Sequence, residues 1–165
     1  MTAMWDKLII LLNQTLELYQ ALLTLSRKKR DILVEARPQE LDLLTRQEEV
    51  LIIEAGRLEN MRLTLARELA AAAGLPPSAT ALSSLIVCAG SETARELSAL
   101  SDRFEQVTKE LVEINGLNTK LIEQSLDFIN YNINILSQSA VGPTYVPKGQ
   151  PLDKGSSRTI LDTRA

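Results

Sequence analysis

Long stretches of helical periodicity are the feature that most constrains how this chain can fold. From Met4 to Ile32, apolar residues return at alternating intervals of three and four, which is the spacing of one buried helix face. The same spacing runs from Leu41 to Leu69 and begins again at Leu97. Aromatic residues make up only 4% of the chain, so the core must consist mainly of aliphatic side chains. The chain is therefore expected to be all-α, an antiparallel bundle of long helices with an extended C-terminal helix.

Glycines and prolines divide this periodic pattern into segments. Pro38 suits the first turn of a new helix, and Gly74 followed by Pro76 and Pro77 ends one. The pattern predicts helices at about 4–34, 38–73, 78–87 and 91–139. Residues 1–140 are expected to form one helical domain, and residues 141–165, rich in proline and glycine, a flexible C-terminal tail.

Charged residues interrupt two of these helices. Glu48 and Arg62 occupy core positions of the second helix, where we expect each to lie at the edge of the buried face and reach water along its stem. Four consecutive cations, residues 27–30, lie near the end of the first helix. Such a cluster can serve nucleic-acid binding, but cations also stabilise a helix C-terminus, and the acidic total favours the second interpretation.

Composition excludes several classes of function. The net charge is −3 with a pI near 5.1, which argues against a nucleic-acid partner. There is no histidine and only one cysteine, Cys88, so triads and zinc clusters cannot form. We therefore expect no enzymatic activity, no metal and no cofactor. The charge-free span 128–147 is too polar for membrane insertion, and no export signal is evident, so a cytoplasmic location is expected.

The predicted last helix changes character near Asn115. Residues 1–113 carry 30 charged side chains, whereas residues 114–147 carry three. The helix keeps one apolar column to its end: Leu100, Val107, Ile114, Leu121, Phe128 and Ile135. It also gains a second, which we call the apolar row: Ile122, Leu126, Ile129, Ile133 and Leu136. Loss of charge with retention of apolar and amide groups is typical of a protein interface. The alternative is packing inside the protein's own bundle, with buried asparagines setting the helix register.

Short elements in two of the predicted helices form a recognisable pattern. The second helix contains Leu41, Leu44, Thr45, Glu48, Glu49, Leu58, Glu59 and Arg62. The last helix contains Asn115 and Asn118, followed by Leu121 and Gln124-Ser125-Leu126. In these elements the chain resembles flagellar export chaperones of the FlgN type. After that helix the family tends to show Tyr-Gly-x-x-Gly-Gln. Here Tyr145, Gly149 and Gln150 keep this spacing, but Val146 replaces the first glycine.

The resemblance implies a chaperone that binds the C-terminal helices of hook–filament junction proteins. It would keep them soluble and unassembled, and bring them to the cytoplasmic domain of the export gate. On this analogy Tyr145 contacts the gate, and cargo is bound by the second half of the last helix. The cargo-binding residues are then expected to be Asn115, Asn118, Ile122, Leu126, Ile129, Ile133 and Leu136.

Two alternatives remain open. The first is a structural coiled-coil protein that uses its last helix to self-associate, for example as a homodimer. The second is a chaperone for another secretion substrate.

Overall fold

The computed structural model describes residues 1–140 of the chain. They form four helices, α1 (Thr2–Val34), α2 (Pro38–Ala72), α3 (Leu82–Cys88) and α4 (Ser91–Ala140), and within this range there is no strand. The chain divides into two units, Met1–Leu126 and the residues from Asp127 onward. The predicted all-α class is confirmed. The predicted tail, 141–165, lies outside the described residues, so its separation from a helical domain 1–140 stays a prediction.

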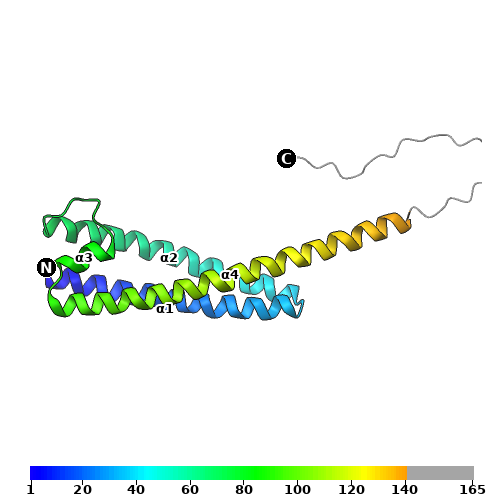
Figure 1. Ribbon diagram of the computed structural model, residues 1–165, viewed down its shortest axis with the longest axis horizontal. Helices are drawn as coiled ribbons and strands as arrows, with labels where there is room; N and C mark the ends of the chain where they lie inside the picture. The colour runs from blue at the N-terminus through cyan, green and yellow to red at the C-terminus, as the bar shows by residue number, and fades with distance from the viewer. Residues whose placement is uncertain (141–165) are drawn as a thin grey trace, which may run out of the picture. The chain divides into compact units, whose positions relative to one another are not determined.

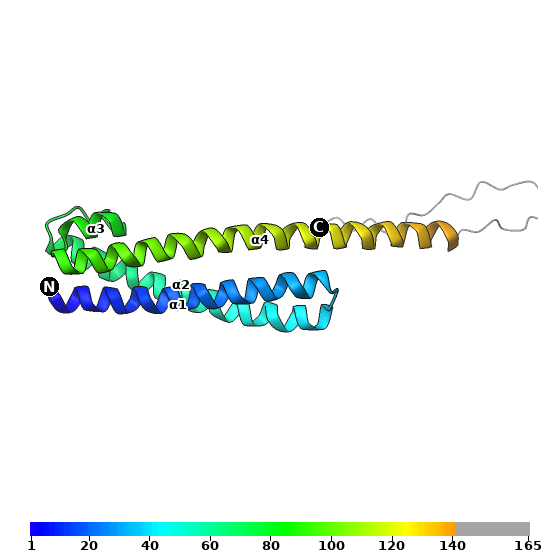
Figure 2. The same cartoon turned by 60° about the horizontal axis from the view of Figure 1, so that its bottom comes forward.

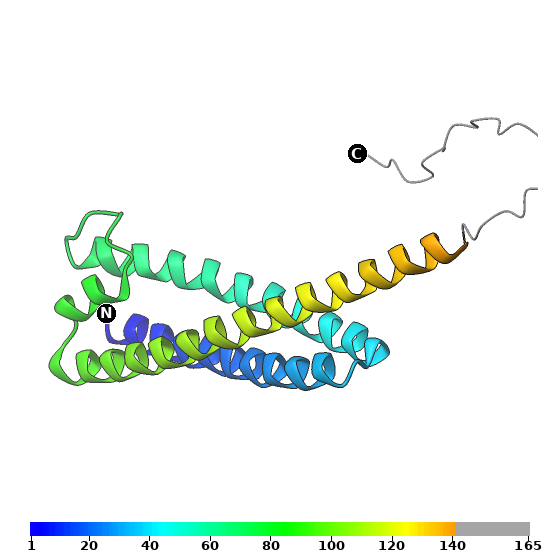
Figure 3. The ribbon, with the colours of Figure 1, turned by 45° about the vertical axis from the view of Figure 1, so that its right-hand side comes forward.

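In the first unit, α1 and α2 form an antiparallel hairpin. The N-terminal part of α4 lies along α1 and runs in the same direction (Figures 1 and 2). The short helix α3 lies at the end of the bundle that holds the N-terminus (Figure 3). The α2–α3–α4 connection thus returns the chain to the start of α1, which allows α4 to pack beside it.

The first two long helices end in the same way, each at a residue with a left-handed backbone conformation. Ala36 has φ 51° and Gly74 has φ 71°. Around Ala36, the amide of Arg37 donates to the carbonyl of Ile32, and around Gly74 the amide of Leu75 donates to that of Ala70. These bonds satisfy carbonyls that a helix end leaves free. Only glycine adopts this conformation without strain, so Ala36 holds the α1–α2 turn at a cost of about 1–2 kcal/mol.

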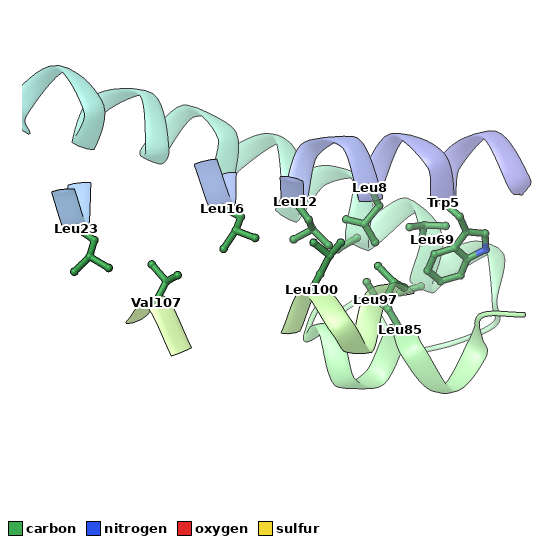
Figure 4. Packing of buried hydrophobic residues seen from close by; sticks show 12 residues of the cluster. Trp5, Leu8, Leu12, Leu16, Leu23, Leu69, Leu85, Leu97, Leu100 and Val107 are labelled. Atoms are coloured by element: carbon green, nitrogen blue, oxygen red, sulfur yellow. The ribbon is translucent and has the colours of Figure 1, made fainter. Parts of the chain in front are cut away.

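Helix α1 has two rows of buried residues, and the apolar spacing of the sequence predicted one of them. In the predicted row, Leu8, Leu11, Thr15 and Ile32 are buried, and the other members are half-buried. A second row contains Trp5, Leu12, Leu16, Leu23 and Ser26, which are also buried. In Figure 4, Leu23 lies opposite Val107 of α4, and Leu12 lies beside Leu100. The second row exists because α1 lies between two partners, α2 and α4.

The third helix begins later than predicted. It was expected from Ser78 but starts at Leu82. The intervening residues form turns instead, with the Ala79 amide donating to the carbonyl of Pro76 and the Thr80 amide to that of Ser78. The consecutive prolines and the short hydroxyl side chains favour these local turns over a helix. Leu85 alone anchors α3 as a fully buried residue.

Candidate functional site

The prediction that Glu48 extends to water is wrong. Glu48 is buried, and its carboxylate forms an ion pair with the ammonium group of Lys29 on α1. Both residues stand at core positions of their helices, and they meet across the hairpin. A buried charge needs such a partner, because removal of a charge from water without one is costly. The periodicity of one helix cannot reveal this pairing, since the partner lies on another helix.

Other cations of the 27–30 cluster are also paired. Arg27 forms an ion pair with Glu110 of α4, and Arg30 pairs with Asp31. Lys29 is held by Glu48, as described above. The pairing of these three cations within the protein supports a structural role for the cluster, rather than a nucleic-acid surface.

Two asparagines of α4 bind the same serine of α1. Asn118 is buried, with 3% of its surface exposed, and its Nδ2 donates to the main-chain oxygen of Ser26 at 2.9 Å. The hydroxyl of Ser26 donates to Oδ1 of Asn115 at 3.1 Å. These bonds join residues about 90 positions apart in the sequence and fix α4 along α1. At Asn118 and Asn115, the amides therefore set the register of the bundle.

One atom of this network lacks a partner. Oδ1 of Asn118 is buried and accepts no hydrogen bond from residues 1–140. A buried acceptor without a donor destabilises the folded state by about 1–3 kcal/mol. Less than 1 Å² of this atom is exposed, so its unmet hydrogen bond is a cost within the folded bundle and not a contact point on its surface.

The residues of the apolar column of α4 are buried near the start of the helix and become exposed further along it. Leu100 and Val107 are buried, and Ile114 and Leu121 are half-buried. In the second unit, Phe128 of the same column is 67% exposed. The sequence pattern continues although the burial does not, which indicates that these residues are available for another molecule.

The apolar row is exposed in both units. Ile122 and Leu126 are exposed in the first unit, and Ile129, Ile133 and Leu136 in the second. The second unit exposes further large side chains that were not among the predicted site residues: Phe128, Tyr131 and Ile135. Phe128 and Ile135 continue the apolar column of the helix, and this spacing could have added them to the predicted site. Exposed apolar residues at this density mark an interaction surface.

A groove lies between the three long helices of the first unit, and we call it the α1–α2–α4 groove. It has a volume of about 350 Å³. Its lining residues are Leu22, Ser26, Lys29, Glu48, Ile52, Leu111, Asn115, Asn118, Thr119 and Ile122. The groove therefore combines apolar side chains with the Lys29–Glu48 pair and both asparagines. Sequence reasoning did not find it, because it depends on how three helices diverge.

Arg62, the second charged residue expected to reach water, also makes internal contacts. Its side chain is 19% exposed, pairs with Glu59 at 2.7 Å and donates from Nη1 to the carbonyl of Thr80 at 3.1 Å. Arg62 thereby ties α2 to the loop before α3. The hydrogen bond with Glu59 raises the pKa of Arg62 and lowers the pKa of the Glu59 carboxyl.

Two further predictions concern the ends of the chain. Tyr145, the predicted gate contact, lies outside the described residues. At the other end, α1 is long and apolar enough to span a membrane by length and composition alone. Its leucines, among them Leu8 and Leu16, belong to the core that packs against α2 and α4. The apolar character of α1 is thus explained by the bundle.

A comparison with protein families matches residues 1–153 to the family described as FlgN protein. No curated protein matched the chain, and no solved structure did. The match covers the bundle, all of α4 and the segment that contains Tyr145, and it agrees with the resemblance found in the second and last helices. FlgN proteins are chaperones of flagellar export. The chain belongs to the FlgN family.

Proposed function

We propose that this protein is a cytosolic chaperone for the junction subunits between flagellar hook and filament. It binds their C-terminal helices, keeps them soluble and unassembled, and brings them to the cytoplasmic domain of the export gate. The observation that carries the proposal is the exposure of the whole apolar row in a member of a flagellar chaperone family.

The chemistry of the apolar row fits a helical ligand. An amphipathic helix is bound through anchors spaced by three, four and seven residues, and the apolar row has this spacing. Burial of each large aliphatic side chain stabilises a complex by about 1.5–3 kcal/mol before the costs of association are subtracted. The nearby residues are mostly amides and hydroxyls, which form adaptable hydrogen bonds. Such a contact is strong enough to hold cargo and weak enough to release it.

The two asparagines of the predicted cargo site take a more specific place in the proposal. Asn115 and Asn118 bind Ser26 and hold α4 on α1. They therefore support the site from within, while the apolar row makes the direct contact. Tyr145, which follows the helix, is proposed as the contact to the export gate on the basis of the family resemblance.

Sedimentation of the full chain with a purified junction subunit tests this function. The proposal predicts a soluble complex of one chaperone and one subunit, and suppression of the subunit's own assembly. A tight homodimer of the chain that persists when the subunit is added would contradict it and favour self-association.

A further inference from the structure

We propose that residues 127–140 of α4 exchange between helix and coil in the free protein, and that cargo binding converts them into a continuous helix. The exchange depends on the exposure and the sequence of these residues, and not on the cargo. Its coupling to cargo rests on the proposed function, because the segment carries three of the five residues of the apolar row. The binding surface is thus completed by the partner that it binds.

The bundle contributes little to the stability of this part of α4. Asn118 is the last buried residue of the helix within the described chain. All of residues 122–140 are exposed except Asn132, which is half-buried. Most of the stability of a protein helix comes from the packing of its apolar face, rather than from intrinsic propensity. Since no apolar side chain of residues 127–140 is buried, the helix must form there by its own propensity.

The sequence of this segment is poor in helix-forming residues. Ten of the 13 residues 128–140 are Asn, Ser, Ile, Phe or Tyr, which belong to the lower part of the helix-propensity order. In residues 92–113 of the same helix, by contrast, 14 of 22 are Ala, Leu, Arg, Lys, Gln or Glu. Even the best helix formers extend a helix with an equilibrium constant of only about 1–1.6 near 0 °C. We therefore expect residues 128–140 to be helical in only a fraction of the free molecules.

Charges give this part of the helix no further support. Glu123 and Asp127 are four residues apart, a spacing at which like charges repel each other on a helix. Among residues 1–140, no ion pair involves a residue of α4 beyond Glu110. The last turn of α4 also has no cation to interact with the helix dipole. Electrostatics therefore does not offset the low propensity of the segment.

The exchange has a consequence for the apolar row. In the helix the row forms one exposed stripe, which is an aggregation hazard in a protein without its partner. In the coil the same side chains no longer share a face. Cargo that contacts the row only in its helical arrangement shifts the equilibrium toward the helix. Because the segment is ordered on binding, part of the interaction free energy is lost, which lowers the affinity and favours release.

Amide hydrogen exchange of the full chain tests the equilibrium without any partner. We expect the amides of residues 128–140 to be protected less than about tenfold relative to an unstructured chain, and those of residues 100–114 about a thousandfold or more. Saturation with a junction subunit should raise the protection of residues 128–140 about tenfold or more. Equal protection of the two segments in a free chain that binds the subunit overturns this inference while the proposed function stands.

Substitutions at two exposed asparagines separate helix stability from contact with cargo. Asn130 and Asn134 are exposed and lie outside the apolar row. Asn130→Ala with Asn134→Ala raises the helix propensity, whereas Asn130→Gly with Asn134→Gly lowers it. By calorimetry, the alanine variant should bind a junction subunit about threefold more tightly than wild type, and the glycine variant about threefold more weakly. Equal affinities of the two variants overturn the coupling to cargo.

Thr108→Ala is the matched control, because Thr108 is exposed on the packed part of the same helix. This substitution also raises helix propensity, but it should leave the affinity for the subunit unchanged. An equal gain in affinity at Thr108 would show that the stability of the whole bundle is responsible, and it overturns the coupling. Failure of the wild-type chain to bind the subunit overturns the coupling and the proposed function together, whereas hydrogen exchange of the free chain decides the helix–coil equilibrium by itself.

Discussion

The side-chain amide of Asn118 donates a hydrogen bond from Nδ2 to the main-chain oxygen of Ser26, at 2.9 Å, and so fixes α4 along α1. The contact has two consequences. It sets which residues of α4 lie in the core, and it leaves Oδ1 of the same amide without a donor. Asn118 is therefore a register element of the bundle, and it is also one of the polar residues that line the α1–α2–α4 groove.

Replacement of Asn118 tests its contribution to the stability of the bundle. Asn118→Ala removes the bond to Ser26 and leaves a small cavity, so we expect a loss of about 1–2 kcal/mol in the free energy of unfolding. Asn118→Leu also removes the bond and the acceptor, but it fills the space that alanine leaves empty, and should cost less than the alanine variant. Urea denaturation measures both. An alanine variant as stable as wild type would show that the hydrogen bond does not hold the register.

The buried Lys29–Glu48 ion pair is expected to affect stability most when only one of its two charges is removed. Lys29→Met leaves Glu48 buried without its partner, and we expect a loss of about 3 kcal/mol in unfolding free energy. The double variant Lys29→Met with Glu48→Leu removes both charges and should recover most of this loss. Denaturation of the single and double variants forms a cycle that tests the coupling. Additive losses in the double variant would contradict the pairing.

The Glu59–Arg62 pair predicts a pH dependence of stability. The hydrogen bond to Arg62 lowers the pKa of the Glu59 carboxyl from its usual value of 4.5. A carboxyl with a lowered folded-state pKa stabilises the fold above its unfolded pKa and loses this effect as the pH falls through the folded value. Glu59→Gln should therefore reduce stability at pH 7 but much less at pH 3, as measured by urea denaturation at both.

A nearby acidic residue on the same helix provides the control for this measurement. Glu49 is exposed and forms no ion pair with any of residues 1–140. Glu49→Gln should leave the pH profile of stability close to wild type. An equal effect of both substitutions on that profile would show that net charge, rather than the bond to Arg62, is responsible.

Tyr145 provides a prediction that separates the two proposed partners. Tyr145→Ala should weaken binding to the cytoplasmic domain of the export gate at least tenfold, because an aromatic anchor is lost. Cargo affinity should stay within twofold of wild type. Tyr145→Phe, which keeps the ring, is the matched variant and should retain most gate binding. Loss of cargo binding in the alanine variant would reverse the assignment.

The helices were predictable because their signals are local. Pro38 and Gly74 act on their own backbone, and apolar spacing reports which face of a helix is buried. The start of α3 was missed because turns at Pro76–Thr80 compete with a helix. The burial of Glu48 was missed for another reason, since its partner lies on a different helix.

The site was predictable to a smaller extent. Charge depletion along α4 indicated an interface, and the apolar row is exposed. The same pattern could not decide between cargo binding and internal register for the asparagines. At Asn118 the structure shows an internal hydrogen bond, because Ser26 offers its carbonyl there. The groove is formed by residues of three helices, so no pattern within a single helix could predict it.

The most direct test of the account is the affinity for a peptide of the C-terminal helix of a junction protein. Ile129→Glu with Ile133→Glu places carboxylates in the apolar row, while Asn130→Glu with Asn134→Glu adds the same charges at the adjacent positions of α4. Calorimetry should show at least a hundredfold loss for the isoleucine pair, because two anchors are removed, and less than threefold for the asparagine pair. Equal affinities of the two variants would contradict the assignment of the apolar row to cargo.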